Sequence, residues 1–268
     1  MEKAEPIFTE PYYIAKIWAA PSAKRWGKDG IGEAVLFSAA PDCPVMTPKG
    51  ATCGRELLRR NIAFPRQVKA IATALPLSVQ VHPVGKNEVW YIDSATAGAR
   101  VYVGFRRRYS FDELQEACAA GTVLGLMGSL AVKSGDVIAV PGGTPHAIGG
   151  NISLYEVGDI GNVTYRLFDY GRGRALQPEL FYRNLAAGDG APELSPRLKV
   201  ARFDVGGSLR AEGNTVVVAL KGGGVISSAG EKKTVGKDSC FFLAAGETVA
   251  FKGSGAFLLI SEGAEILN

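Results

Sequence analysis

Histidine is scarce in this sequence: among 268 residues there are only two, His82 and His146. Any site that needs imidazole must therefore use one or both of these positions. Cysteine is scarce too, and the four cysteines are scattered without a C-x-x-C pair. This distribution excludes a zinc-finger pattern and a disulfide framework, and it favours a reduced cytosolic protein.

Long apolar runs are also absent, since no stretch approaches the roughly 20 residues needed to cross a membrane. The first residues lack the apolar core of a secretion signal. We therefore expect a cytoplasmic protein with no membrane partner. The net charge is only +4, and no Lys/Arg stripe interleaves with aromatic residues. These features exclude nucleic acid as a partner and mildly favour an anionic small substrate.

Polar residues alternate with apolar ones in the segment 77–82. If this segment is a strand, Leu77, Val79 and Val81 share one face, while Ser78, Gln80 and His82 share the other. Glu88 follows after a short turn and can return to the same cavity. The polar face then offers an amide oxygen, an imidazole and a carboxylate, which need a wet or charged environment.

The second histidine ends the segment 135–146, in which a short apolar strand is followed by a Pro-Gly-Gly turn. His146 stands where the next strand would begin. Two imidazoles and two oxygen ligands suit one divalent ion such as zinc, with a position left for water or substrate. We therefore predict a metal site formed by Gln80, His82, Glu88 and His146.

The spacing of these segments resembles the two motifs of the cupin superfamily. Gly135, Pro141, Gly143 and His146 match the second motif position by position. In the first motif, Gln80 stands where most metal cupins have histidine. The resemblance implies a jelly-roll β-barrel around the metal.

The residues within and around these motifs are similar to those of type I mannose-6-phosphate isomerases, which are zinc enzymes. The similarity lies in Gln80-Val-His82-Pro, Lys86-x-Glu88-x-Trp90-Tyr, Pro145-His146-Ala-Ile-Gly and Thr164-Tyr-Arg166-Leu-Phe-Asp169-Tyr-Gly-Arg172. It covers about 77–172. The chain departs from this family in three places: only five residues separate His82 from Glu88, Val-Gly follows Glu156, and Arg174-Ala-Leu-Gln177 stands where a histidine is frequent.

An aldose–ketose isomerase must move a proton between two adjacent carbons, which requires a polarised carbonyl and a base. Glu156 is the candidate base, and its alternative role is to orient a metal ligand. The resemblance matches Arg166 to an active-site arginine that binds the phosphate or neutralises the enediolate; its alternative is an ion pair at a sheet edge. Lys86 and Ser78 are candidates for contacts with the substrate. Alternatively, Lys86 is an ordinary surface residue and Ser78 only lines the cavity.

Many short β-rich segments punctuated by glycine and proline predict an all-β protein with a few short helices. Helical patterns occur at 54–72, at 111–120 behind a capping box that starts at Ser110, and at 177–184. A linker at 186–192 divides a catalytic metal-binding cupin domain with helical insertions (1–185) from a C-terminal β domain (186–268). The second half lacks histidine, so we interpret it as a degenerate cupin; an unrelated β-cap is the alternative.

The sequence thus predicts an isomerase with one zinc ion per chain that interconverts mannose 6-phosphate and fructose 6-phosphate. One alternative is a different metal cupin enzyme, such as an iron or manganese oxygenase or one acting on another sugar phosphate. Another is a sugar-binding or regulatory cupin without turnover. The oligomeric state is left open by the sequence.

Overall fold

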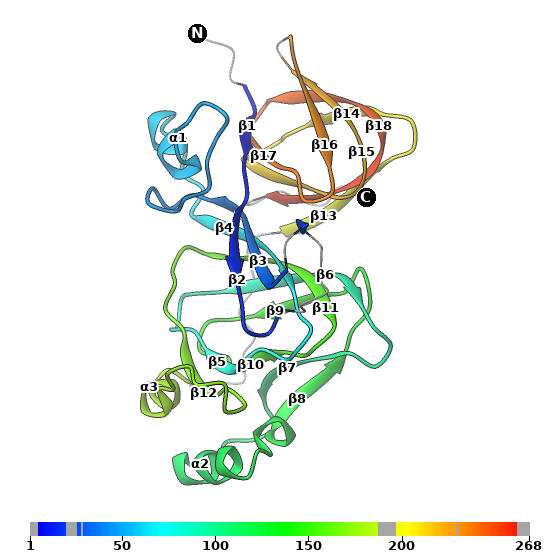
Figure 1. Ribbon diagram of the computed structural model, residues 1–268. Coiled ribbons are helices and arrows are strands. Elements are labelled where there is room, and N and C mark those ends of the chain that lie inside the picture. The colour runs from blue at the N-terminus through cyan, green and yellow to red at the C-terminus, as the bar shows by residue number, and fades with distance from the viewer. Residues whose placement is uncertain (1–4, 20–25, 28, 187–196, 229, 262–268) are drawn as a thin grey trace. The chain divides into compact units, whose positions relative to one another are not determined.

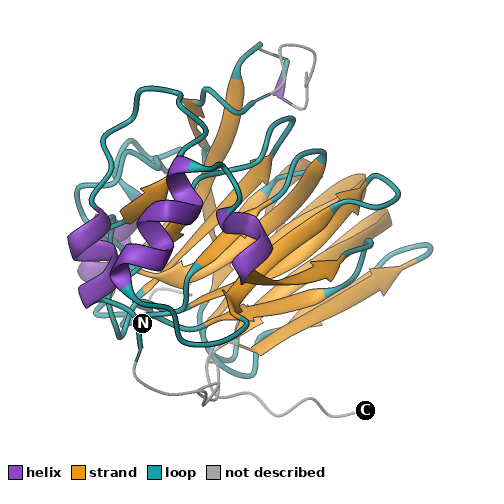
Figure 2. Cartoon of the chain, turned by 90° about the horizontal axis from the view of Figure 1, so that it is seen from below, coloured by secondary structure: helices purple, strands orange, loops and turns teal. Residues whose placement is uncertain are grey.

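The computed structural model describes residues 5–19, 26–27, 29–186, 197–228 and 230–261. Antiparallel strands dominate these residues, and the helices are few and short (Figure 2). The all-β prediction is therefore confirmed. The chain divides into two compact units (Figure 1): unit 1 takes residues 1–12, 35–69 and 195–268, and unit 2 takes 13–34 and 70–194.

The strands of unit 1 form a sheet in the order β1-β17-β15-β18-β13, with β14 paired to β18 and β16 paired to β15. Their bounds are β1 Ile7–Thr9, β13 Arg197–Phe203, β14 Gly207–Arg210, β15 Thr215–Ser228, β16 Glu231–Gly236, β17 Cys240–Leu243 and β18 Thr248–Ser261. Alternation along β18 shows how the sequence produces this sheet. Val249 and Phe251 are buried while Thr248 and Ala250 are exposed, as expected of a strand with one covered face.

Aromatic rings fill the core of unit 1. Phe251 lies between Phe203 and Phe257, with ring centroids 5.6 and 5.0 Å away. Such tilted and edge-to-face pairs add to the stabilisation that comes from burying apolar area. Unit 1 therefore has an aromatic core of its own.

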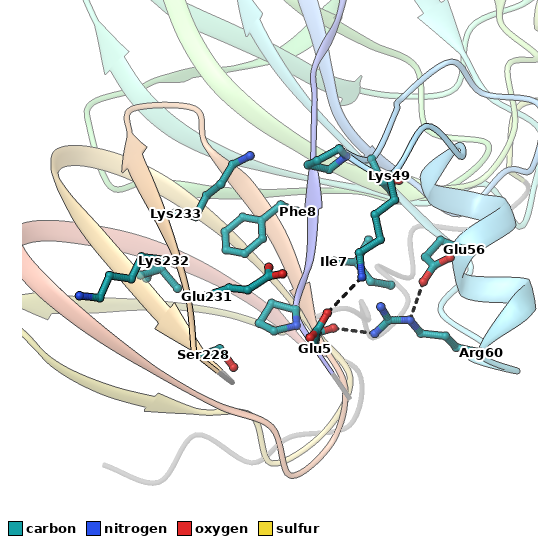
Figure 3. A pocket seen from close by; sticks show the side chains of 14 residues that line it. Glu5, Ile7, Phe8, Lys49, Glu56, Arg60, Ser228, Glu231, Lys232 and Lys233 are labelled. Carbon is teal, nitrogen blue, oxygen red and sulfur yellow. Dashed lines mark hydrogen bonds and ion pairs between the residues drawn. The ribbon is translucent and has the colours of Figure 1, made fainter. Parts of the chain in front are cut away.

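A cavity of about 110 Å³ lies within unit 1, lined by residues at the start of β1, residues 47–49, α1 (Cys53–Arg59) and the β15–β16 hairpin (Figure 3). Two of its carboxylates, Glu5 and Glu56, are paired with cations. Lys49 Nζ lies 3.1 Å from Glu5 Oε2, and Arg60 Nε donates to Glu56 Oε1 at 2.8 Å. Arg60 Nη1 also donates to Glu5 O at 2.6 Å, which connects the N-terminal segment to the C-cap of α1, so we interpret this cavity as a structural feature.

Two sheets contain the strands of unit 2, in the orders β12-β5-β10-β7-β8 and β2-β3-β4-β11-β6-β9. Boundaries between the units fall within β2, β3 and β4. The strand bounds are β2 Tyr12–Ala15, β3 Ile31–Ser38, β4 Arg66–Ala72, β5 Val79–Val81, β6 Glu88–Ala95, β7 Arg100–Phe105, β8 Met127–Ala131, β9 Val137–Val140, β10 His146–Ile148, β11 Ile152–Asp159 and β12 Tyr165–Phe168. The helices are α2 Phe111–Ala119, the 3₁₀ helix η2 Val123–Leu126 and α3 Pro178–Arg183.

A core cluster in unit 2 surrounds Trp90, which is fully buried among side chains that include Trp18, Ile92, Ile148 and Leu154. These residues come from different strands and from the segment after β2, so the cluster holds the strands of this unit together by burying apolar area. This cluster also forms an apolar surface that excludes water beside the polar residues described below.

Two of the three predicted helices are confirmed. The predicted capping box opens α2, because Ser110 Oγ accepts from the Glu113 N–H and Glu113 Oε2 accepts from the Ser110 N–H. α3 begins with Pro178 as expected. The helix predicted over 54–72 is wrong beyond Arg59, because Arg66–Ala72 forms β4. Pro65 breaks the helical pattern, and pairing with neighbouring strands then outweighs the local preference.

The predicted linker, 186–192, lies outside the described residues from 187 onward. The division into 1–185 and 186–268 stays a prediction; in the structure, residues 1–12 and 35–69 group with the C-terminal residues in unit 1. Within the described residues, no helix is long and apolar enough to span a membrane.

Candidate metal centre

Three candidate residues form a row across one sheet of unit 2. In the antiparallel register, Arg166 on β12 lies opposite Gln80 on β5, and Gln80 lies opposite His146 at the start of β10. Directly opposed residues project from the same face of a sheet and have neighbouring side chains. Strand pairing therefore brings an arginine, an amide and an imidazole side by side, although they are far apart in the sequence.

His82, directly after β5, and Glu88, the first residue of β6, join this row. His82 Nε2 lies 2.9 Å from Glu88 Oε1, and the His82 and His146 ring centroids are 5.0 Å apart. Ligand atoms of these three buried residues lie within 4.8 Å of one another. Around a tetrahedral zinc ion with bonds of about 2.0–2.2 Å, ligand atoms are roughly 3.3–3.6 Å apart, so these side chains can hold the ion after shifts of about 1 Å.

Backbone carbonyls orient both imidazole rings. His82 Nδ1 lies 2.8 Å from Val163 O, and His146 Nδ1 lies 2.9 Å from Thr144 O. Because a carbonyl oxygen only accepts, each Nδ1 carries the hydrogen and donates it. In the neutral ring of His146, Nε2 then keeps its lone pair, as in metal sites where a second interaction sets the tautomer.

The Glu88 carboxylate is buried and has a different partner on each oxygen. Oε2 accepts from Trp90 Nε1 at 3.3 Å, and Oε1 accepts from Lys86 Nζ at 3.2 Å. Burial alone would raise the pKa of Glu88, but His82 and Lys86 outweigh it and hold this pKa well below its usual value. The carboxylate is therefore ionised at neutral pH, as a metal ligand must be.

Burial has the opposite consequence for His146, whose pKa it lowers to about 4, with a further contribution from His82. The ring is neutral at neutral pH, which is the form that binds a metal. Together, the neutral His146 and the ionised Glu88 are a donor set that suits a divalent cation.

Gln80 lies in contact with this cluster but presents its amide nitrogen to it. Gln80 Nε2 donates to His146 Nε2 at 3.2 Å, while Gln80 Oε1 accepts from Ser78 Oγ at 3.0 Å. Turning the amide group over exchanges its oxygen and nitrogen in place. Ligation by Gln80 therefore requires this rotation and no movement of the backbone, and Gln80 as the fourth ligand stays a prediction.

The other predicted residues also face this region. Glu156 on β11 lies opposite Trp90 on β6, so its side chain projects from the same face as Trp90 and Glu88. Lys86 Nζ lies 3.2–3.3 Å from both ring nitrogens of His82. Ser78, which is buried, contacts Gln80 as described. The structure thus brings all the predicted residues into one region, while their roles stay predictions.

The sequence reasoning missed two residues that contact the site. Trp90 bonds Glu88 and packs edge-on against His146, with ring centroids 5.6 Å apart. Strand alternation from Glu88 to Trp90 could have indicated this shared face. Gln177, which binds the backbone of Arg166, carries no such signal, because that contact depends on how the chain returns after β12.

Comparisons with known proteins agree on one family. A mannose-6-phosphate isomerase from Streptococcus mutans is 34% identical over 210 residues, which is 66% of this chain and 66% of that protein. A mannose-6-phosphate isomerase from Bacillus subtilis is 30% identical over 196 residues, 63% of this chain and 62% of that one. The chain belongs to the mannose-6-phosphate isomerase family. No model of a protein family matches the chain.

Solved structures of isomerases of this family share the fold. The mannose 6-phosphate isomerase from Bacillus subtilis superposes with a TM-score of 0.81 at 22% identity, covering 96% of this chain and 99% of that one. A mannose 6-phosphate isomerase bound with zinc and yttrium superposes with a TM-score of 0.71 at 13% identity, covering 97% of this chain and 100% of that one. The predicted cupin-like fold is thus confirmed. The matched segments span 62–66% of the curated relatives' own lengths.

Proposed function

We propose that this protein interconverts mannose 6-phosphate and fructose 6-phosphate, using one zinc ion per chain. The observation that carries this proposal is the buried cluster of His82, Glu88 and His146, with both imidazoles held through Nδ1 and with Arg166 in the adjoining row. The proposed reaction and substrate class are those of the family members, which are mannose-6-phosphate isomerases.

The donor set of two imidazoles and a carboxylate, with the Gln80 amide beside them, is typical of zinc sites that keep a position for substrate. When bound, the ion supplies a Lewis acid that polarises the sugar carbonyl and neutralises charge developing on its oxygen. A solved mannose 6-phosphate isomerase that shares the fold is bound with zinc and yttrium.

In the proposed reaction, Glu156 accepts the proton from C2 of the open-chain aldose and returns it to C1, which yields the ketose. Its position opposite Trp90, on the face shared with Glu88, supports this role because a base must reach carbons held beside the cluster. First, the electrons of the C2–H bond form a second bond between C1 and C2, and the C1 carbonyl oxygen takes up the proton that the C2 hydroxyl releases. Then the C2 oxygen forms the new carbonyl, and the electrons of the C1–C2 double bond take the proton back from Glu156 at C1.

Positive charge beside the cluster suits a phosphorylated sugar. The Arg166 guanidinium can bind a phosphate through two parallel hydrogen bonds. Arg166 Nε is buried without a partner among the described residues, as expected of a donor that awaits a ligand. Lys86 adds a second cation, and Ser78 adds a hydroxyl on the wall of the site.

The direct test is to add mannose 6-phosphate and to measure fructose 6-phosphate with a coupled enzyme. We expect turnover that disappears after chelation and returns with added zinc, together with about one zinc per chain by elemental analysis. Binding of mannose 6-phosphate without turnover would instead indicate a sugar-binding cupin. Turnover of a different sugar phosphate, or a requirement for iron or manganese, would indicate another metal cupin enzyme.

A further inference from the structure

We propose that Gln177 is a positioning residue for Arg166: it binds the exposed backbone edge at Arg166 and thereby aims the guanidinium at the sugar phosphate. The inference rests on the proposed function, because it takes Arg166 as the residue that binds the substrate anion. It concerns a residue in the loop between β12 and α3, outside the predicted set of site residues.

Arg166 lies on an edge strand. In the order β12-β5-β10-β7-β8, β12 has a partner on one side only. The Arg166 N–H donates to Gln177 Oε1 at 3.1 Å, and Arg166 O accepts from the Gln177 N–H at 2.8 Å. Both backbone groups of Arg166 therefore point away from β5, and Gln177 satisfies them both, as a residue of a further strand would.

This arrangement also sets the relation between Arg166 and Gln80. Because the backbone groups of Arg166 turn outward, its pair with Gln80 is of the non-hydrogen-bonded kind, in which opposed residues approach most closely. The strand register shifts immediately afterwards, between Arg166 and Phe168. A bulge next to Arg166 changes the direction of nearby side chains and interrupts the strand pairing. The backbone of Arg166 therefore needs a further interaction to fix its conformation.

The guanidinium of Arg166 has no such constraint of its own. Among the described residues it makes no hydrogen bond, and its Nε is buried without a partner. The two neighbouring arginines differ in this respect, since Arg172 and Arg174 both bind the buried carboxylate of Asp169. The direction of the Arg166 side chain is therefore set by its backbone, and one side of that backbone is held by Gln177.

Among the described residues, the hydrogen bond to the Arg166 N–H is the only one that the Gln177 side chain makes. Gln177 is the N-cap of α3, but its side chain makes no capping hydrogen bond. Replacing the amide thus leaves the helix start unchanged, and the Gln177 N–H to Arg166 O bond belongs to the backbone and also stays. A side-chain substitution removes one interaction, the acceptor for the Arg166 N–H.

The experiment compares Gln177→Met, which keeps the size but lacks the acceptor, with Gln177→Glu, which keeps an acceptor oxygen. We expect kcat/KM for mannose 6-phosphate to fall about tenfold in Gln177→Met, mainly through a higher KM, and to stay within about twofold in Gln177→Glu. Zinc content is expected to be unchanged in both. Equal kcat/KM in the Met variant and the wild type would overturn the proposal.

A double-mutant cycle separates positioning from a general structural role. If Gln177 acts through Arg166, Gln177→Met has no further effect on kcat/KM in an Arg166→Ala background. The same tenfold loss in both backgrounds would show that Gln177 acts elsewhere and would refute the proposal.

Amide hydrogen exchange gives a readout that does not need activity. The Arg166 N–H is expected to be protected in the wild type and in Gln177→Glu, and to lose protection in Gln177→Met. An Arg166 N–H equally protected in Gln177→Met would contradict the inference. A wild-type protein without turnover would reject the proposed function, while the exchange data would still decide whether Gln177 holds the Arg166 backbone.

Discussion

Trp90 is expected to control metal affinity through its hydrogen bond to Glu88. The indole Nε1 donates to Glu88 Oε2 at 3.3 Å, and both side chains are buried. This bond leaves Oε1 as the oxygen that faces His82. In Trp90→Phe the carboxylate loses its orienting donor, while an aromatic ring remains in the core.

The size of the effect follows from two independent magnitudes. A hydrogen bond to a charged group contributes about 1.5–3 kcal/mol. Losing a group that orients a metal ligand weakens metal binding about 10- to 100-fold, which corresponds to roughly 1.4–2.8 kcal/mol. The two ranges agree, so we expect zinc affinity to fall by one to two orders of magnitude in Trp90→Phe.

The assay is a competition titration of zinc between the metal-free protein and a chromogenic chelator. Trp18→Phe is the matched control, since Trp18 is equally buried in the same core cluster but makes no bond to a predicted ligand. Each variant is expected to lose about 1–3 kcal/mol of unfolding free energy in the absence of metal. Only Trp90→Phe should lose zinc affinity. Wild-type affinity in Trp90→Phe, or an equal loss in Trp18→Phe, would refute the reasoning.

Three other predictions test the centre and its surroundings. His146→Ala is expected to lose zinc and activity together, and zinc at full stoichiometry in this variant would contradict the site. Glu156→Gln is expected to keep zinc but to stop exchange of the C2 proton with solvent; normal exchange would leave Glu156 only an orienting role. Burial would raise the pKa of Asp169, but Arg174 and Arg172 outweigh it and lower this pKa. The ion pairs of Asp169 with Arg174 and Arg172 thus stabilise the folded protein above about pH 4. This contribution is lost as the pH falls through the lowered pKa of Asp169 in the folded protein. Asp169→Asn should reduce the unfolding free energy by about 3 kcal/mol at pH 7, and the difference from wild type should shrink as the pH is lowered from 4; a difference that does not change with pH below 4 would contradict it.

Local patterns predicted those features that depend on neighbouring residues in the chain. The capping box placed the start of α2, and alternation placed Gln80 on the polar face of its strand. The same local reasoning failed at β4, where a helical pattern after Pro65 is overridden by strand pairing. Periodicity reports which face a residue occupies, whereas the choice between helix and strand also depends on the neighbours that the fold supplies.

By itself, the sequence determined the chemistry available to this protein: two imidazoles, a carboxylate and an amide, in an order that resembles one family of isomerases. Only the tertiary structure decided which groups meet. Strand register places Arg166 beside Gln80 and Gln80 beside His146, and the return of the chain after β12 brings Gln177 to the backbone of Arg166. These contacts join residues whose separation along the chain contains no periodic signal, because they arise when distant strands pair to satisfy their backbone groups.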